Sequence, residues 1–354
     1  MARGLQRAGR RSNLALLGLL LLAGGTGVLG FALGTPTAGR VVAVAHGAAG
    51  LGLLLLVPWK TVVVRRARAR PAALRAPSAA YWLTGLVAVC IVSGVLHSAG
   101  AAGTWATSGT PVAALQVHVG AAIVLTVALV AHTWGRHQRP RTVDLRRRTL
   151  LGAGALAGGS LALWGVTEGV WRLTGAPGAR RSGTGSYERG TDDPAAMPVT
   201  QWASDTVPED PPDGASGEVR LVAGGCEVVL RARDLDRGDE VRARLDCTGG
   251  WYADQQWRGT TLQRLVAEQL GGAGAAAQCI RVTSVTGFSR RIPLRDAGRT
   301  LLATHAAGRP LSPGHGAPVR LVAPGRRGVW WVKWVDRVEV LDSPWWLQPP
   351  FPLQ

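Results

Sequence analysis

The chain has 354 residues and a formal net charge of +18 at neutral pH, so nucleic-acid binding is the first function class to consider. In the first half, however, the basic residues occupy short loops between apolar segments, where a membrane accounts for them. The second half carries no aromatic-basic RNA or DNA motif. We therefore exclude nucleic acid as a partner. The composition also divides the chain, with residues 1–171 rich in Leu, Ala, Val and Gly and the rest mixing charged residues with short β-branched runs.

Five apolar segments of the first half are each long enough, at about 20 residues, to cross a bilayer as helices. They lie near residues 13–34, 41–64, 80–100, 111–135 and 149–171. We predict a membrane α-helical bundle over residues 1–171, with the lipid bilayer as its partner.

The distribution of Lys and Arg predicts the orientation of this bundle. Basic residues gather before the first segment (Arg3 and Arg7 among them), after the second and after the fourth, whereas residues 101–110 carry no charge. Loops rich in Lys and Arg stay on the cytoplasmic side. We therefore expect a multi-pass protein of the cytoplasmic membrane with its N-terminus inside and everything after residue 171 on the extracytoplasmic side.

Five of the seven histidines lie in or beside the predicted helices. His46, His97 and His118 lie near the outer ends of the second, third and fourth segments, and His132 lies near the inner end of the fourth. Ionisable residues at membrane depth indicate function, and neutral imidazole is an axial haem ligand. His118 and His132 share one helix face about 21 Å apart, a spacing similar to that of cytochrome b helices that hold two haems.

The outer layer offers a pair of axial ligands on different helices, His46 with His118, and His97 as a substitute for either. The inner layer does not, because the other candidate, His137, lies on the same helix as His132. The sequence therefore favours one outer haem b over two. It also leaves open helices without haem that serve as an anchor or as a docking surface facing quinone.

Residues 172–217 are rich in Gly, Pro, Ser and Asp, and we predict a flexible linker there. Residues 218–342 read as an α+β, mostly β, domain, and residues 343–354 form a Trp- and Pro-rich tail. The predicted helices are 261–270, with Thr260 and Gln263 at capping-box spacing, and 296–307, with an acidic start. The predicted strands are 218–222, 226–232, 240–245, 280–285, 319–322 and a run within 328–341.

Two motifs of this domain carry the chemistry. Leu-Asp-Cys-Thr-Gly-Gly-Trp at 245–251 presents Cys247, and His-Gly-Ala-Pro-Val-Arg at 315–320 is followed by Lys333. A thiolate is a soft metal ligand, whereas Arg supplies a rigid fork for phosphate, Lys a point charge and His a ring donor. This set resembles the molybdopterin-binding domain of the sulfite oxidase family, over roughly residues 218–342.

The resemblance implies a molybdenum–molybdopterin cofactor whose metal is held by Cys247, the catalytic residue. It also implies that His315, Arg320 and Lys333 contact the pterin, while the glycines at 314 and 316 let the backbone approach it. Cys247 alone would more often be a structural thiol. A Cys226–Cys279 disulfide is a further alternative that would leave Cys247 free.

The sequence departs from the sulfite-oxidising members of the family that it resembles. Those members have arginines a few residues after the cysteine. Here those places hold Gly249, Gly250, Trp251 and Tyr252. We therefore expect a less charged small-molecule substrate, such as a sulfoxide or N-oxide, reduced with electrons from quinol or another membrane partner. The alternatives are a membrane-tethered binding module that lost the metal and a cytochrome subunit whose outer domain only docks a partner.

The last apolar segment starts with Arg147-Arg148-Thr149-Leu150-Leu151-Gly152, which looks like a twin-arginine export motif inside the chain. Ordinary basic flanking of a helix explains the same residues. The resemblance favours export, because molybdopterin is inserted in the cytoplasm and its domain must cross the membrane folded.

Overall fold

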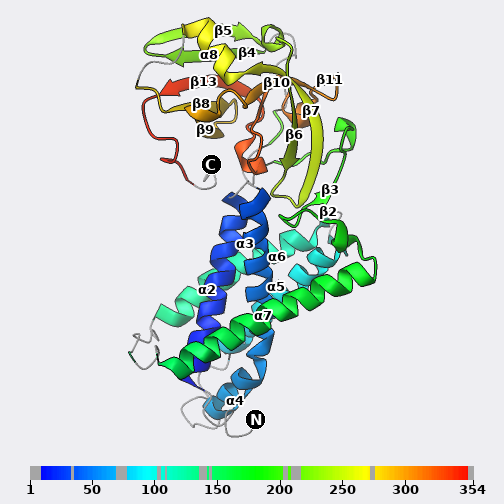
Figure 1. The fold of residues 1–354 in the computed structure, drawn as a ribbon, viewed down its shortest axis with the longest axis vertical. Helices are drawn as coiled ribbons and strands as arrows, with labels where there is room; N and C mark the ends of the chain where they lie inside the picture. Colours follow the sequence, from blue (N-terminus) through cyan, green and yellow to red (C-terminus); the bar gives the residue numbers. More distant parts are fainter. Residues whose placement is uncertain are drawn as a thin grey trace. The chain divides into compact units, whose positions relative to one another are not determined.

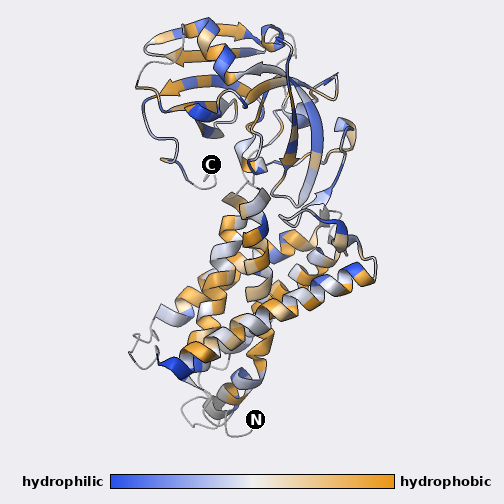
Figure 2. Cartoon of the chain, in the orientation of Figure 1, coloured by the Kyte–Doolittle hydropathy of each residue, from blue (hydrophilic) through white to orange (hydrophobic). Residues whose placement is uncertain are grey.

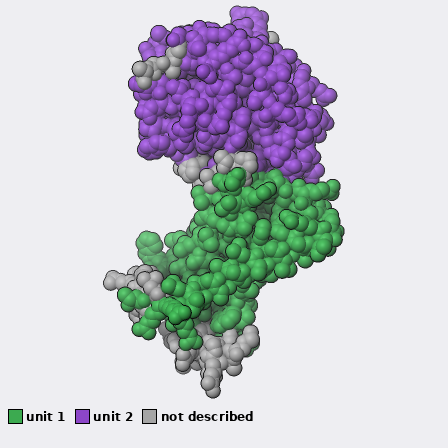
Figure 3. Space-filling view, viewed as in Figure 1, with its two compact units in different colours: residues 1–30, 37–185 green, residues 31–36, 186–354 purple. Residues whose placement is uncertain are grey.

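The computed structural model describes residues 9–32, 36–68, 78–101, 105–107, 110–134, 142, 146–201, 206–208, 217–271 and 276–349. His137, Arg3 and Arg7 lie outside these residues. The chain forms two compact units (Figure 3), unit 1 with residues 1–30 and 37–185 and unit 2 with residues 31–36 and 186–354.

Unit 1 is helical, and five of its helices are long and apolar enough to cross a membrane, as predicted. Apolar residues run along these helices, as Figure 2 shows by colour. Many of their side chains are exposed. The described helices are α2 (Arg10–Ala32), α3 (Pro36–Leu55), α4 (Val57–Arg68), α5 (Ser78–Ala99), α6 (Ala114–Trp134) and α7 (Arg147–Leu173).

Two of the predicted helices differ in extent from those observed. The segment 41–64 is divided between α3 and α4 by a turn at Leu56, because Pro58 has no N–H for a continuous helix and suits the first turn of a new one. The segment 111–135 begins only at Ala114, because the preceding residues form a short antiparallel hairpin of β1 (Trp105–Thr107) and β2 (Thr110–Val112).

Residues 172–201 differ from the flexible linker predicted over 172–217. In unit 1, η3 (Pro177–Arg180) follows α7, and the next residue, Arg181, forms an ion pair with Glu168 and donates to the carbonyl of Ser98 at 3.1 Å. In unit 2, β3 (Tyr187–Glu188) pairs in parallel with β7. Composition predicts no such specific bonds, so it could not identify these residues as ordered.

Unit 2 is mostly β, as predicted, and consists of two sheets (Figure 1). In the first, the order is β11-β10-β7-β3, with β6 also paired to β7 and β12 to β10. Besides β3, its strands are β6 (Asp239–Asp246), β7 (Trp251–Thr261), β10 (Leu301–Ala306), β11 (Arg309–Pro310) and β12 (Arg320–Val322).

The second sheet has the order β5-β4-β13-β8-β9, and its pairs are antiparallel apart from the parallel pair of β4 with β13. Its strands are β4 (Glu218–Ala223), β5 (Cys226–Arg231), β8 (Cys279–Ser284), β9 (Ser289–Pro293) and β13 (Val335–Leu341). Buried side chains of both sheets form one hydrophobic core, in which Trp257 of β7 is fully enclosed.

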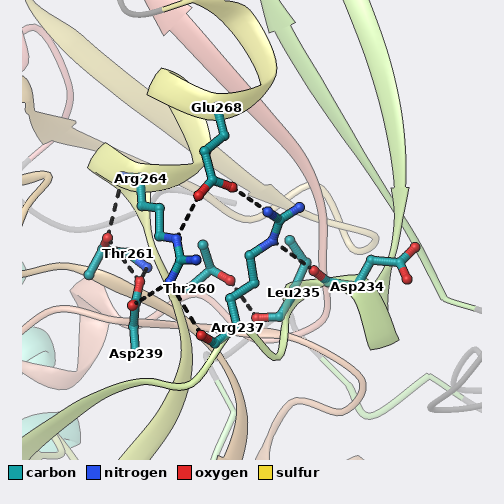
Figure 4. Close-up of polar contacts among 8 residues, drawn as sticks. All are labelled: Asp234, Leu235, Arg237, Asp239, Thr260, Thr261, Arg264 and Glu268. Atoms are coloured by element: carbon teal, nitrogen blue, oxygen red, sulfur yellow. Dashed lines mark hydrogen bonds and ion pairs between the residues drawn. The ribbon is translucent and has the colours of Figure 1, made fainter.

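The helix predicted over 261–270 is α8 (Leu262–Leu270), but its cap differs from the prediction. Thr261, not Thr260, is the N-cap, and its hydroxyl accepts from the backbone N–H of Arg264 at 3.3 Å. The Thr260 hydroxyl donates instead to the carbonyl of Leu235 at 2.5 Å. Figure 4 shows this start of α8, where Arg264 also bonds Glu268 one turn on, at 2.7 Å. With Thr261 as the N-cap, the third helical residue is Arg264 and not Gln263, so the predicted capping box does not form.

The helix predicted over 296–307 is wrong. The segment forms a single turn, η6 (Leu294–Asp296), and then the strand β10. Residues 301–304 are all buried, and β10 pairs with β7 on one side and with β11 and β12 on the other. Pairing on both edges and burial on both faces override the local helical preference.

Candidate active site

Cys247 lies in the tight connection between β6 and β7. Its N–H donates to the carbonyl of Trp251 at 2.8 Å, and its carbonyl accepts from Gly250 at 3.1 Å. Gly250 has a φ of 87°, which an L-residue rarely adopts. The N–H of Gly249 points back to the Cys247 Sγ at 3.3 Å. The Gly-Gly sequence therefore builds a turn that fixes the sulfur and donates a hydrogen bond to it.

A buried ion pair holds this connection from the neighbouring segment. Arg327 Nη1 lies 2.6 Å from Asp246 Oδ1, with side chains 7% and 13% exposed. Ser186 donates to the same carboxylate oxygen at 2.6 Å, and Arg327 Nη2 donates to the carbonyl of Cys247 at 3.4 Å. A Cβ on Gly328 would lie 3.0 Å from the Cys247 Cα. No sequence pattern predicts this contact beyond the position of Asp246 next to the cysteine.

His315 is buried with both ring nitrogens engaged. Nε2 lies 3.1 Å from the carbonyl of Met197, and Nδ1 lies 2.7 Å from the hydroxyl of Ser312. Burial lowers the pKa of His315, as do the charges of Arg320 and Lys333, and the bond to Met197 opposes them. The ring is therefore neutral at pH 7. Since a carbonyl only accepts, Nε2 carries the proton and Nδ1 accepts from Ser312.

Arg320 is a buried cation, 1% exposed, with no carboxylate partner among the described residues. Its Nη1 donates to the carbonyl of His315 at 3.0 Å, and its guanidinium lies 5.1 Å and 5.6 Å from the rings of Trp257 and Trp331. The buried Nε has no hydrogen-bond partner in the described structure. Burial lowers the pKa of Arg320 to about 10, against the opposing effect of Cys247, so the group stays charged at pH 7. A buried, partly unsatisfied cation suits an anionic group of a ligand.

Lys333 donates to the carbonyls of Thr200 and Gly314, at 2.8 and 2.7 Å. Gly316 lies between the stems of the two cations. Its φ is 102°, and a Cβ there would lie 3.1 Å from the Cβ atoms of both Arg320 and Lys333. The glycine therefore permits the close approach of these two residues.

Residues 197–200, which the sequence placed in the linker, connect the predicted site residues. The Thr200 hydroxyl lies 3.2 Å from the Cys247 Sγ, and the Thr200 carbonyl accepts from Lys333. The Met197 carbonyl bonds His315, and a Cβ on Gly314 would lie 2.7 Å from Val199. The segment 197–200 thus contacts Cys247, Lys333 and His315. No sequence signal marks Thr200, which stands in a stretch of low periodicity.

The other cysteines of unit 2 are free. Cys226 pairs in register with Ala223 of β4, and Cys279 with Leu341 of β13, so β4 and β13 separate the two cysteine strands. Three strand spacings amount to about 14 Å, whereas a disulfide joins Cα atoms at most about 7 Å apart. The Cys226–Cys279 alternative is therefore wrong.

In unit 1 the structure brings together His46 of α3 and His118 of α6, whose ring centroids lie 5.7 Å apart at an interplanar angle of 85°. His97 of α5 instead hydrogen-bonds the backbone of Gly185. His132 lies in the last turn of α6, about 21 Å along the helix from His118. His46 and His118 are thus the pair of candidate ligands that the structure brings together.

Part of the chain matches a known family. Residues 225–346 match the sequence model of a family described as the oxidoreductase molybdopterin binding domain. This part of the chain is accordingly similar to the molybdopterin-binding domains of oxidoreductases. No curated protein matches the chain.

Among solved structures, the sulfane dehydrogenase SoxCD from Paracoccus pantotrophus is similar at 23% identity and a TM-score of 0.35. The match covers 37% of this chain and 39% of that one, so the chain spans about two fifths of its length. Unit 1 lies outside the matched residues 225–346 of the family.

Proposed function

We propose that the chain is a membrane-anchored, molybdenum-dependent oxidoreductase. The observation that carries the proposal is the convergence of Cys247 and Lys333 on Thr200, beside a buried Arg320 whose Nε lacks a partner. A soft thiolate and two cations fit a metal held by a phosphorylated pterin. When bound, this cofactor would supply a redox-active metal that exchanges an oxygen atom with substrate.

The chain's own residues would then hold and tune the cofactor. Cys247 would ligate the molybdenum, while Arg320 and Lys333 would bind the pterin phosphate. Neutral His315 would offer its Nε2–H, which now bonds Met197, to a pterin acceptor. The Thr200 hydroxyl and the Gly249 N–H both reach the Cys247 Sγ. Hydrogen bonds to a ligating sulfur tune the metal's electronic properties.

We propose a neutral oxygenated substrate, a sulfoxide or N-oxide, and reduction as the direction. Around the Cys247 connection, two arginines are engaged in ion pairs, Arg327 with Asp246 and Arg244 with Asp254. With Arg320 assigned to the cofactor, none of these three is a dedicated cation for an anionic substrate.

Five apolar helices support an anchor in the cytoplasmic membrane, with the N-terminus inside and the oxidoreductase domain outside. We further propose that Arg147 and Arg148, at the start of α7, direct export of the folded domain. Replacing both by Lys should leave the domain inside, inaccessible to external protease. Unchanged protease access would refute this proposal.

We also propose that His46 and His118 bind one haem b, which passes electrons from quinol or another membrane partner towards the molybdenum. Their proximity supports this pair over His97 and His132. The competing function, a tethered module without metal, would not require an unpaired buried cation such as Arg320.

Turnover of the full-length protein tests the proposed function. We expect it to oxidise a reduced dye when a sulfoxide or N-oxide is added, and we expect Cys247→Ser to abolish this turnover. Cys226→Ser is the matched control, because Cys226 is exposed on β5. Protein that only reduces artificial acceptors, or a Cys247→Ser variant that still turns over, would contradict the proposal.

A further inference from the structure

Two helical hairpins of unit 1 carry the same sequence pattern. Residues 26–29 of α2 read Thr-Gly-Val-Leu, and residues 93–96 of α5 read Ser-Gly-Val-Leu. In each case the next long helix carries a histidine followed by Gly-Ala-Ala, directly after His46 and one residue later after His118. The similarity indicates that α2–α3 and α5–α6 are two copies of one unit.

In the first copy, α2 binds and orients the imidazole of His46. Its Nδ1 lies 2.9 Å from the carbonyl of Ala23. One turn later, a Cβ on Gly27 would lie only 3.3 Å from the His46 Cε1. The hydroxyl of Thr26 donates to its own helix, to the carbonyl of Leu22 at 2.6 Å.

The second copy repeats these contacts one for one. His118 Nδ1 lies 2.8 Å from the carbonyl of Cys90. One turn later, a Cβ on Gly94 would lie 3.2 Å from the His118 ring. The hydroxyl of Ser93 donates to the carbonyl of Val89 at 2.5 Å. These residues therefore make equivalent contacts in the two hairpins, and the first copy adds the Thr26 hydroxyl at 3.3 Å from the His46 Nδ1.

These contacts determine the tautomer of both rings. A backbone carbonyl only accepts, so each Nδ1 carries the proton and each Nε2 keeps its lone pair. Within the described helices neither Nε2 has a hydrogen-bond partner, and the two rings are 5.7 Å apart. Neutral imidazoles fixed in this way through Nδ1 are typical metal ligands.

The repeat also separates this pair from the other histidines. By position, His97 corresponds to Gly30 of the first copy, and His132 corresponds to Lys60. Neither of these counterparts is a histidine. Among these four histidines, only His46 and His118 occupy equivalent positions in the two copies.

We propose that the two hairpins form a pseudo-symmetric holder for one bis-histidine haem, in which Gly27 and Gly94 are equivalent positioning residues. Each glycine leaves room for its imidazole to lie against the neighbouring helix while Nδ1 bonds the carbonyl one turn earlier. A side chain at either position would push the ring from this orientation. The inference rests on the proposed haem at His46 and His118, and adds the residues that orient both ligands.

The test uses the full-length protein in detergent, with haem per chain and the low-spin spectrum as readouts. Gly27→Val and Gly94→Val should each weaken haem retention by about 10- to 100-fold, the usual effect of disturbing residues that orient metal ligands. Gly30→Val and Gly120→Val are matched controls, because a Cβ at either position meets nothing within 4 Å. Gly27→Ala and Gly94→Ala, with a smaller displacement, should retain haem with a shifted low-spin spectrum.

Molybdenum content in every variant reports whether the rest of the chain is intact. Wild-type haem retention and spectra in the Gly27 and Gly94 variants, or an effect in only one of them, would overturn the equivalent positioning roles. In that case haem loss in His46→Ala and His118→Ala would leave the haem assignment standing. Haem absent from the wild type, or kept in both histidine variants, would overturn the haem assignment itself.

Discussion

Replacing Arg327 by Met should destabilise the connection that carries Cys247. The side chains of Arg327 and Asp246 are 7% and 13% exposed and 2.6 Å apart, and the substitution leaves the carboxylate buried with Ser186 as its remaining partner from this cluster. Removing one member of a buried pair costs about 3 to 5 kcal/mol. We expect about 3 kcal/mol here, because Ser186 still donates to Asp246.

Hydrogen exchange in the full-length protein measures this effect locally. Peptides covering β6 and β7 should exchange over 100-fold faster in Arg327→Met, as about 3 kcal/mol implies at 1.4 kcal/mol per factor of ten. Arg244→Met is the matched control, since its pair with Asp254 joins the same strands but is 48% and 27% exposed, which predicts a change of about 1 kcal/mol or less.

A second substitution separates the loss of the pair from the loss of Arg327 packing. Adding Asp246→Leu to Arg327→Met removes the buried carboxylate and should recover at least half of the lost protection, because an apolar pair avoids the desolvation penalty. An Arg327→Met variant that exchanges no faster than Arg244→Met would refute the reasoning.

Three further predictions concern the candidate active site. Thr200→Val removes a hydrogen bond to the Cys247 Sγ, so molybdenum should remain bound with a lower midpoint potential in a redox titration followed by electron paramagnetic resonance; an unchanged potential would contradict this. Burial lowers the pKa of His315 in the folded chain. As the pH falls below the ordinary value of 6.5, the unfolded chain therefore binds more protons than the folded chain, and the free energy of unfolding decreases. His315→Gln should flatten this loss between about pH 7 and about pH 5 in unfolding experiments, and parallel pH curves would argue against it. Gly316→Ala should cost about 1 to 3 kcal/mol of unfolding free energy, because its φ is 102° and Lys333 lies close; a loss below about 0.5 kcal/mol would show that the backbone adapts.

The sequence predicted best those features that depend on local pattern. The five apolar helices follow from length and hydropathy alone, and most strands of unit 2 follow from β-branched runs. The segment 296–307 was misjudged because β10 is determined by pairing with β7 and β12, which no local preference reports. Gly250 and the turn after Cys247 were predictable, since Gly-Gly marks a tight turn.

The site itself was predictable only in part. Cys247, His315, Arg320 and Lys333 stood out through residue type and spacing. The structure places all four in one domain and brings Cys247, His315 and Lys333 into contact with residues 197–200. Thr200 was missed because its contact with Cys247 spans 47 residues of chain. The ion pair of Arg327 and Asp246 spans 81 residues and was missed for the same reason.

The central claim is that this domain carries molybdenum at Cys247, and metal analysis of the full-length protein tests it most directly. The protein should be purified from a host that makes molybdopterin, alongside Cys247→Ala and the control Cys226→Ala. We predict near-stoichiometric molybdenum per chain in the wild type and in Cys226→Ala, and almost none in Cys247→Ala. Wild-type protein without molybdenum, or an equal molybdenum content in all three proteins, would contradict the account.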